Sequence, residues 1–265
     1  MLLAGATTAV HLGSHALIDP DEGRTASIAL AMATSGDFLV PRFNGLPFLD
    51  KPGLFYATQA LAMRRLGATE TAARLPALLA AWGTAAATAW FAARLFGPDT
   101  AWIAGTAALT APLALAMART ARADSLLALF MVVALMAFFQ AVKGRAGGRG
   151  WLGWTLVAWA AMGAGVLTKG PVALAVPLLV AAPWAAWRRR SIAVWHPAGG
   201  GLFLLLVVPW ALAVEARVPG FLRYGLVTET WERLTRDSLQ RGGPVWYFLP
   251  YLVAGCLPWL VVVTS

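Results

Sequence analysis

Charged residues are scarce in this chain of 265 residues, since they make up 12% of it against roughly 25% in soluble domains. Hydrophobic residues reach 59%, and 13 of the residues are tryptophan. This composition excludes an ordinary soluble domain and predicts an all-α, polytopic membrane protein. We expect membrane lipids as neighbours and no nucleic-acid partner.

Cysteine is also nearly absent. Cys256 is the single one, so an intrachain disulfide is excluded and cysteine usage does not identify the redox compartment. Because Cys256 lies in an apolar segment, we expect a small buried hydrophobic residue. We also expect no cleavable signal sequence, which would need a charged start and a small-residue cleavage site. Internal spans would therefore direct membrane insertion.

Long apolar runs are what the chain has in quantity. A helix needs about 20 residues to cross the bilayer core. Seven segments meet this requirement approximately: residues 72–96, 100–118, 125–142, 151–167, 171–187, 194–214 and 245–263. Residues 1–12 are too short and predict the end of a further span, which gives about eight transmembrane helices. We interpret residues 1–265 as one transmembrane domain, the amino-terminal fragment of a longer protein with later spans and a soluble carboxy-terminal domain.

Two short loops, 143–149 and 188–190, carry only basic charges and fall on the same side of the membrane in this count. The positive-inside rule places them in the cytoplasm. Residues 19–69, 119–124, 169–170 and 217–243 then face outward. Basic residues are normally rare in short outer loops, yet Arg119, Arg122 and Lys169 lie there. An anionic ligand on the outer face would explain them.

The first outer loop contains two helical patterns. Asp19 suits the N-cap of the first, with Glu22 in its first turn and Gly36 as its stop. The second runs from Pro52 to Gly67 and suits a helix in the membrane interface. Residues 44–47 between them read as a turn.

Asp21 is the polar residue that capping does not explain. A cap at Asp19 or Glu22 needs only one acceptor, whereas a second carboxylate beside a membrane adds repulsion that something must compensate. Lys51 lies at the start of the interfacial helix, where backbone N–H groups also favour anions. Lys169 lies near the apolar boundary and therefore needs an anionic partner.

Arg122 and Asp124 lie at the start of a predicted helix. They could form a structural ion pair there or bind a ligand, and the sequence does not decide between the two. Cations of this kind hold a lipid phosphate through charge-assisted hydrogen bonds, and a carboxylate such as Asp21 takes a proton from an attacking hydroxyl. Group transfer from a lipid phosphate is the chemistry indicated. Two alternatives are a lipid or glycolipid flippase and a non-enzymatic assembly factor. Transporters usually place ionisable groups near the bilayer midplane, whereas these charges gather at one face.

A set of short motifs resembles the membrane-embedded C-type glycosyltransferases, in the branch of the lipid A aminoarabinose transferases and the dolichyl-phosphate-mannose protein mannosyltransferases. The motifs are Asp19-Pro20-Asp21-Glu22, Ser35-Gly36-Asp37, Asn44-Gly45-Leu46-Pro47, Lys51-Pro52, Ala73-Arg74-Leu75-Pro76, Arg122-Ala123-Asp124, Leu167-Thr168-Lys169-Gly170-Pro171, and Glu229 with Arg233. Each motif is weak alone, but together they cover nearly the whole chain.

The resemblance implies an inverting glycosyltransferase that moves a sugar from a polyprenyl phosphate to a lipid, glycan or protein acceptor at the outer face of the cytoplasmic membrane. Asp21 matches the catalytic aspartate and Asp124 the second acidic position. Lys51 matches the lysine that contacts the donor phosphate, and we expect Lys169 and Arg122 to assist it. Glu22, Glu229 and Arg233 are expected at an acceptor or structural site.

Two departures from the aminoarabinose transferases affect the expected cofactor. Asp50 stands where those proteins carry a glutamate, and Thr230 and Arg241 stand where they carry histidines. The resemblance therefore predicts no certain cofactor, and it supports neither a divalent metal nor lipid A as the acceptor.

Overall fold

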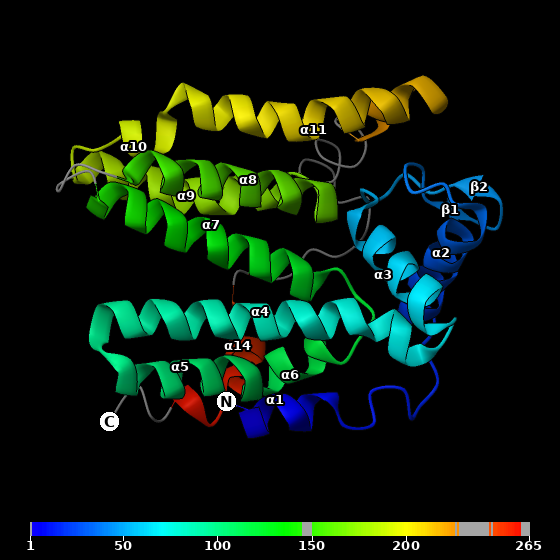
Figure 1. Ribbon diagram of the computed structural model, residues 1–265, viewed down its shortest axis with the longest axis horizontal. Helices are drawn as coiled ribbons and strands as arrows, with labels where there is room; N and C mark the ends of the chain where they lie inside the picture. Colours follow the sequence, from blue (N-terminus) through cyan, green and yellow to red (C-terminus); the bar gives the residue numbers. More distant parts are fainter. Residues whose placement is uncertain (1, 145–149, 226, 228–243, 245, 261–265) are drawn as a thin grey trace.

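The structure is a computed structural model that describes residues 2–144, 150–225, 227, 244 and 246–260. It is helical, as predicted, with a single short hairpin in the described part. Its elements are α1 (Leu2–Ala9), α2 (Asp21–Ser35), β1 (Arg42–Phe43), β2 (Leu46–Pro47), α3 (Leu54–Leu66), α4 (Glu70–Phe96), α5 (Pro98–Thr110), α6 (Pro112–Ala118), α7 (Asp124–Gly144), α8 (Trp151–Lys169), α9 (Val172–Trp187), α10 (Ile192–Trp195), α11 (Pro197–Arg217), α12 (Phe221–Arg223) and α14 (Leu249–Cys256). The long helices run alongside one another, and α2, α3 and the hairpin gather at one end of them (Figure 1).

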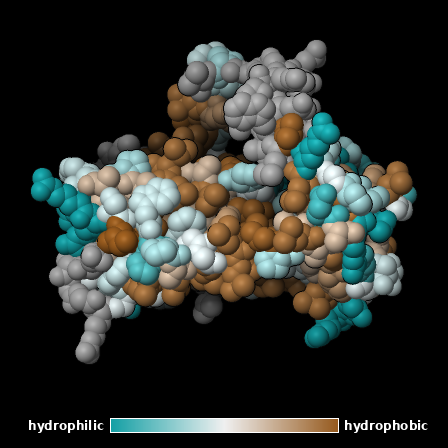
Figure 2. Space-filling model, turned by 90° about the horizontal axis from the view of Figure 1, so that it is seen from above, coloured by the Kyte–Doolittle hydropathy of each residue, from teal (hydrophilic) through white to brown (hydrophobic). Residues whose placement is uncertain are grey.

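Four helical segments of the described chain are long and apolar enough to cross a membrane, and a bent pair would make a fifth. The four are Glu70–Phe96, Asp124–Gly144, Trp151–Lys169 and Ile192–Arg217. Figure 2 agrees with this arrangement, because hydrophobic residues cover the middle of the face it shows and hydrophilic residues gather toward both ends. The protein is thus a multi-pass membrane protein.

The predicted number of about eight spans is not confirmed. The expected span 100–118 bends by 63° between α5 and α6, where Pro112 has no N–H to continue the helix. At 16 residues, α9 is about 24 Å long, which is less than the bilayer core of about 30 Å. The expected span 245–263 lies partly outside the described residues, and α14 within it ends at Cys256.

The two helices predicted within residues 19–69 are present. α2 ends at Ser35, and the predicted stop Gly36 follows it in the left-handed conformation (φ 75°). The predicted N-cap is wrong, because Pro20 occupies that position and no side chain caps the helix. The turn at 44–47 is confirmed: Asn44 and Gly45 have φ values of 51° and 81° and join β1 to β2.

Two clusters of buried side chains bring distant segments together. One joins α2, α3 and the start of α4 through the buried residues Ala26, Ile28, Ala29, Met32, Tyr56, Ala60, Met63, Ala72 and Ala73. The other joins α7, α8, α9 and α10, and eight of its thirteen buried residues are alanines, whose small side chains let helix backbones approach closely. As a result, the start of α7 and the end of α8 lie at the same end of the molecule as α2 and α3 (Figure 1).

Candidate active site

Asp21 is the first residue of α2, and its half-exposed carboxylate is held between two guanidinium groups. Its Oδ1 atom lies 3.1 Å from Arg24, one helical turn along α2. Its Oδ2 atom lies 3.1 Å from Arg122, which comes from the loop before α7. The predicted site residues Asp21 and Arg122, a hundred residues apart in sequence, therefore meet.

Asp124 and Lys169 form the second contact of the site. Asp124 begins α7 and Lys169 ends α8, so the packing of these neighbouring helices brings them together. Lys169 Nζ donates to Asp124 Oδ1 at 2.5 Å, and Arg122 Nε lies 3.8 Å from Asp124 Oδ2. Lys169 thus has the anionic partner that its position requires. Arg122 links the two predicted acidic residues, because it contacts both Asp21 and Asp124.

Lys51 completes the group and has no ion-pair partner in the described part of the chain. Burial lowers the pKa of Lys51, the nearby positive charge of Lys169 lowers it further, and Asp124 partly opposes both effects. We call Asp21, Arg24, Lys51, Arg122, Asp124 and Lys169 the charged cluster. It holds four cations and two carboxylates, so an anion would be stabilised there.

A small polar pocket lies inside the charged cluster. Its lining residues are Asp21, Arg24, Thr25, Lys51, Phe55, Tyr56, Arg122, Ala123 and Asp124, and its volume is about 20 Å³. Such a space holds about one water molecule, so a larger ligand requires these side chains to move. The sequence reasoning missed Arg24, Thr25 and Tyr56. Spacing could have found the first two, because they follow Asp21 by three and four positions on the same helix face.

A larger apolar pocket of about 510 Å³ reaches the same carboxylate, Asp124, from the membrane-spanning region. It is lined by residues of α4, α5, α6, α7 and α14, namely Ala81, Thr84, Ala108, Ala111, Leu113, Ala114, Met117, Asp124, Ser125, Ala128, Gly255 and Cys256. Cys256 is half-buried on this wall rather than fully buried as predicted. Asp124 therefore stands at the junction between an apolar pocket and a cationic one.

Glu22 is not a helix cap, and its contacts are those of the structural site that was one of its two expected roles. Its carboxylate is buried and pairs with Arg74 of α4, with Nε to Oε1 at 3.0 Å and NH2 to Oε2 at 2.9 Å. It also accepts hydrogen bonds from the backbone N–H groups of Ile18 and Ala121. Burial alone would raise the pKa of Glu22, but these hydrogen bonds outweigh burial and lower it. Its role in the structure is to connect α2, α4 and the loop that carries Arg122.

Arg119 lies outside the charged cluster, which corrects the expectation that an anionic ligand explains Arg119 together with Arg122 and Lys169. Its guanidinium donates to the carbonyl oxygens of Thr8 and Val10 at 2.8 Å and of His11 at 3.3 Å. It thereby satisfies carbonyl groups at the end of α1. Glu229 and Arg233 lie outside the described residues.

The residues near Asp50 do not fit a metal site. The Asp50 carboxylate accepts a hydrogen bond from the Tyr224 hydroxyl at 2.8 Å. The described part of the chain contains no group of three or more histidine, cysteine, aspartate or glutamate side chains that could hold a metal ion. Thr230 and Arg241, which replace the histidines of the aminoarabinose transferases, lie outside the described residues.

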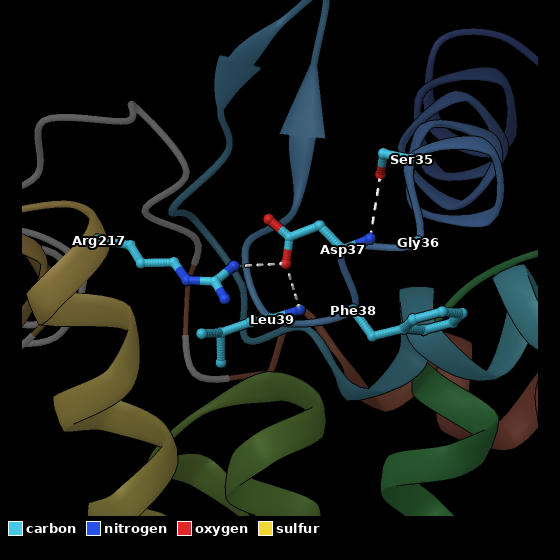
Figure 3. Close-up of a pocket in the computed structure, with 6 residues that line it drawn as sticks. All are labelled: Ser35, Gly36, Asp37, Phe38, Leu39 and Arg217. Atoms are coloured by element: carbon cyan, nitrogen blue, oxygen red, sulfur yellow. Dashed lines mark hydrogen bonds and ion pairs between the residues drawn. The ribbon is translucent and has the colours of Figure 1, made fainter.

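A second polar hollow lies beside the end of α11, with a volume of about 610 Å³ (Figure 3). Asp37 lies between its walls, where its Oδ1 atom accepts from Arg217 NH1 at 3.0 Å and from the N–H of Leu39 at 3.0 Å. This contact joins the segment between α2 and β1 to α11. None of its residues was predicted as a site residue.

Comparisons with known proteins agree with this arrangement. The chain matches the model of the dolichyl-phosphate-mannose-protein mannosyltransferase family over residues 23–225. It is 35% identical over 259 residues to the undecaprenyl phosphate-alpha-4-amino-4-deoxy-L-arabinose arabinosyl transferase of Edwardsiella ictaluri, over 95% of this chain and 46% of that protein. The corresponding protein of Enterobacter sp. is 33% identical over 255 residues, or 93% of this chain and 45% of that protein.

A solved structure matches as well. The crystal structure of ArnT from Cupriavidus metallidurans bound to undecaprenyl phosphate has a TM-score of 0.85 and 32% identity, over 98% of this chain and 48% of that chain. The chain therefore spans about half the length of the relatives it matches. The predicted resemblance to C-type glycosyltransferases is confirmed, and the chain belongs to the dolichyl-phosphate-mannose-protein mannosyltransferase family.

Proposed function

We propose that this chain carries the catalytic end of an inverting glycosyltransferase that moves a sugar from a polyprenyl phosphate to an acceptor. One observation carries the proposal: the apolar pocket and the cationic pocket meet at Asp124. A polyprenyl phosphate has the matching chemistry, because its chain is apolar and its phosphate is anionic. The relatives named for an undecaprenyl phosphate-linked sugar support the same class of donor.

In this proposal the side chains of the charged cluster bind the phosphate of the donor. Lys51 is its best candidate ligand, since it is a half-buried cation with no ion-pair partner in the described residues. Arg122 now contacts Asp21 and Asp124, and Lys169 contacts Asp124. To bind the phosphate, each cation gives up part of these carboxylate contacts. Charge-assisted hydrogen bonds to the phosphate oxygens would then replace carboxylate contacts of similar strength.

Asp21 is the proposed general base. An acceptor hydroxyl oxygen forms a bond to the anomeric carbon of the sugar, while the bond from that carbon to the phosphate oxygen breaks. The hydroxyl proton passes to the Asp21 carboxylate, and the polyprenyl phosphate leaves with the bonding electrons. Cations around its oxygen atoms stabilise the charge that develops there. Attack opposite to the leaving group inverts the configuration at the anomeric carbon.

We place this chemistry at the outer side of the cytoplasmic membrane, with a lipid, glycan or protein as the acceptor. The basic loops support this orientation, because Lys143 and residues 188–190 lie at the opposite ends of their helices from the charged cluster. Single cysteines introduced at Asn44 and Arg189 in a Cys256→Ser background should react with impermeant reagents from opposite sides. Labelling of both in intact cells would overturn the orientation.

The experiment that tests the function is a transfer assay with the full natural protein in membranes. Undecaprenyl phosphate carrying a labelled sugar should lose that sugar to an acceptor in a native membrane extract. A flippase would instead move the intact donor across a sealed vesicle without breaking the bond between sugar and phosphate. Donor translocation without transfer would overturn the proposal.

A further inference from the structure

The turn that ends α9 consists of three consecutive arginines, Arg188, Arg189 and Arg190. Its backbone closes with two hydrogen bonds, from Arg189 N to Ala186 O at 2.9 Å and from Arg190 N to Ala185 O at 2.7 Å. This pair of bonds forms a Schellman motif, whose C′ position is left-handed and usually glycine. Arg189 occupies that position with φ 54°. A side chain there costs free energy that glycine avoids, so the turn keeps an arginine at the expense of stability.

The arginine turn lies at the far membrane boundary from the charged cluster. Arg190 NH1 donates to Val142 O at 3.0 Å, which fixes the turn against the end of α7. Since α7 has 21 residues, its two ends are separated by about 30 Å, the thickness of a bilayer core. In Figure 1 the carboxy-terminal end of α9 and the short helix α10 lie at one end of the molecule, whereas α2 and α3 lie at the other.

Three cations of this surface are exposed, and one of them, Lys143, lies with its Nζ 5.9 Å from the centre of the Phe139 ring. Lys143, Arg188 and Arg189 are exposed, and none forms an ion pair with another residue in the described ranges. Two tryptophans flank the turn, Trp187 with 77% and Trp195 with 52% of its surface exposed. Exposed tryptophan beside arginine is typical of the level at which lipid headgroups lie.

We propose that the arginine turn, with Lys143, binds the phosphate headgroup of an anionic phospholipid in the leaflet opposite the charged cluster. Guanidinium groups suit a phosphate because they donate two parallel hydrogen bonds. The positive-inside rule explains basic charge anywhere in this loop, but it does not explain an arginine at the left-handed position. A ligand that binds the side chain of Arg189 would explain why an arginine is kept at that position.

The test uses the full protein in lipid nanodiscs of phosphatidylcholine with increasing fractions of phosphatidylglycerol, with bound lipid counted by native mass spectrometry. Arg189→Gly removes the cation and relieves the backbone at once. We expect it to weaken phosphatidylglycerol retention about fivefold while the unfolding temperature stays level or rises. Arg189→Lys should retain most of the binding, because it keeps the charge.

Arg65→Gln is the matched control, because Arg65 is an exposed arginine in the last turn of α3, at the other end of the molecule. It should leave retention of phosphatidylglycerol unchanged. Retention by Arg189→Gly equal to that of the parent would overturn the proposal, as would an equal loss in Arg65→Gln.

Discussion

Glu22 and Arg74 form a buried, two-point ion pair between α2 and α4, although 52 residues separate them in sequence. The remaining donors of Arg74 bind the carbonyl oxygens of Leu12, His15 and Ala16, at 2.9 to 3.0 Å. Because Glu22 also accepts from the N–H of Ala121, the pair connects the segments that carry Asp21 and Arg122. We infer that it sets the geometry of the charged cluster without contacting a substrate.

Glu22→Gln should destabilise the protein by about 3–5 kcal/mol, because it leaves the buried guanidinium of Arg74 without its counter-charge. The unfolding temperature of the purified protein in detergent measures this effect. Asp99→Asn is a suitable control, since Asp99 is an acidic first-turn residue of α5 without an ion pair among the described residues. A Glu22→Gln variant as stable as the control would contradict the inferred role.

Acid should weaken the same contact. The pKa of Glu22 is lowered in the folded protein, so its stabilising contribution is fully present above the ordinary value of 4.5. It is lost as the pH falls from there through the lowered pKa. The stability difference between the parent and Glu22→Gln should therefore shrink below pH 4.5 in thermal unfolding at stepped pH. A difference that grew on acidification would have the wrong sign.

The sequence was sufficient for the class and for most of the cluster. The scarcity of charged residues and the long apolar runs predict membrane-spanning helices. The motifs predict one site that contains Asp21, Lys51, Arg122, Asp124 and Lys169. In the structure these five residues lie close together. The expectation of a helix cap at Glu22 was wrong, because a glutamate after Asp-Pro fits a helix start by local rules, whereas the alternative of a structural site agrees with its contacts. Its actual partner, Arg74, lies on another helix, and local rules contain no information about tertiary contacts.

The expected count of about eight spans was not confirmed for a related reason. Hydropathy averages over a window and does not register where a helix breaks, whereas Pro112 separates α5 from α6 by a 63° bend. Pocket shape is equally inaccessible from the sequence. The apolar pocket is formed mostly by small side chains of five helices, and no single segment of the sequence indicates that they converge on Asp124.

Lys51→Ala should weaken donor binding about 10- to 100-fold, because it removes a charge-assisted contact to the phosphate. Lys51→Arg should recover part of the affinity and should also keep it at higher pH. The reason is that the lowered pKa of Lys51 makes it lose its charge earlier than an ordinary lysine as the pH rises, whereas arginine stays charged. Equilibrium binding of undecaprenyl phosphate across pH 7 to 10 checks both statements. Equal affinity in the parent and Lys51→Ala would exclude Lys51 as a phosphate ligand.

Ala128→Phe should obstruct the apolar pocket, since Ala128 lines it one helical turn after Asp124. We expect a higher KM for a donor with a full undecaprenyl chain and a smaller change for a donor with two isoprene units. Val180→Phe adds bulk to an exposed position on α9 and serves as the control. If both donors were affected equally, the pocket would not be the site of the lipid chain.

The most direct test of the proposed chemistry is the initial rate of labelled sugar transfer by Asp21→Asn in the full protein. This variant keeps the size of the side chain and removes the proton acceptor, so we expect the rate to fall about 10²- to 10⁴-fold while undecaprenyl phosphate still binds. Asp37→Asn, which alters a carboxylate outside the charged cluster, should transfer at nearly the parent rate. Transfer by Asp21→Asn at the parent rate, together with its loss in Asp124→Asn, would contradict the assignment and make Asp124 the base.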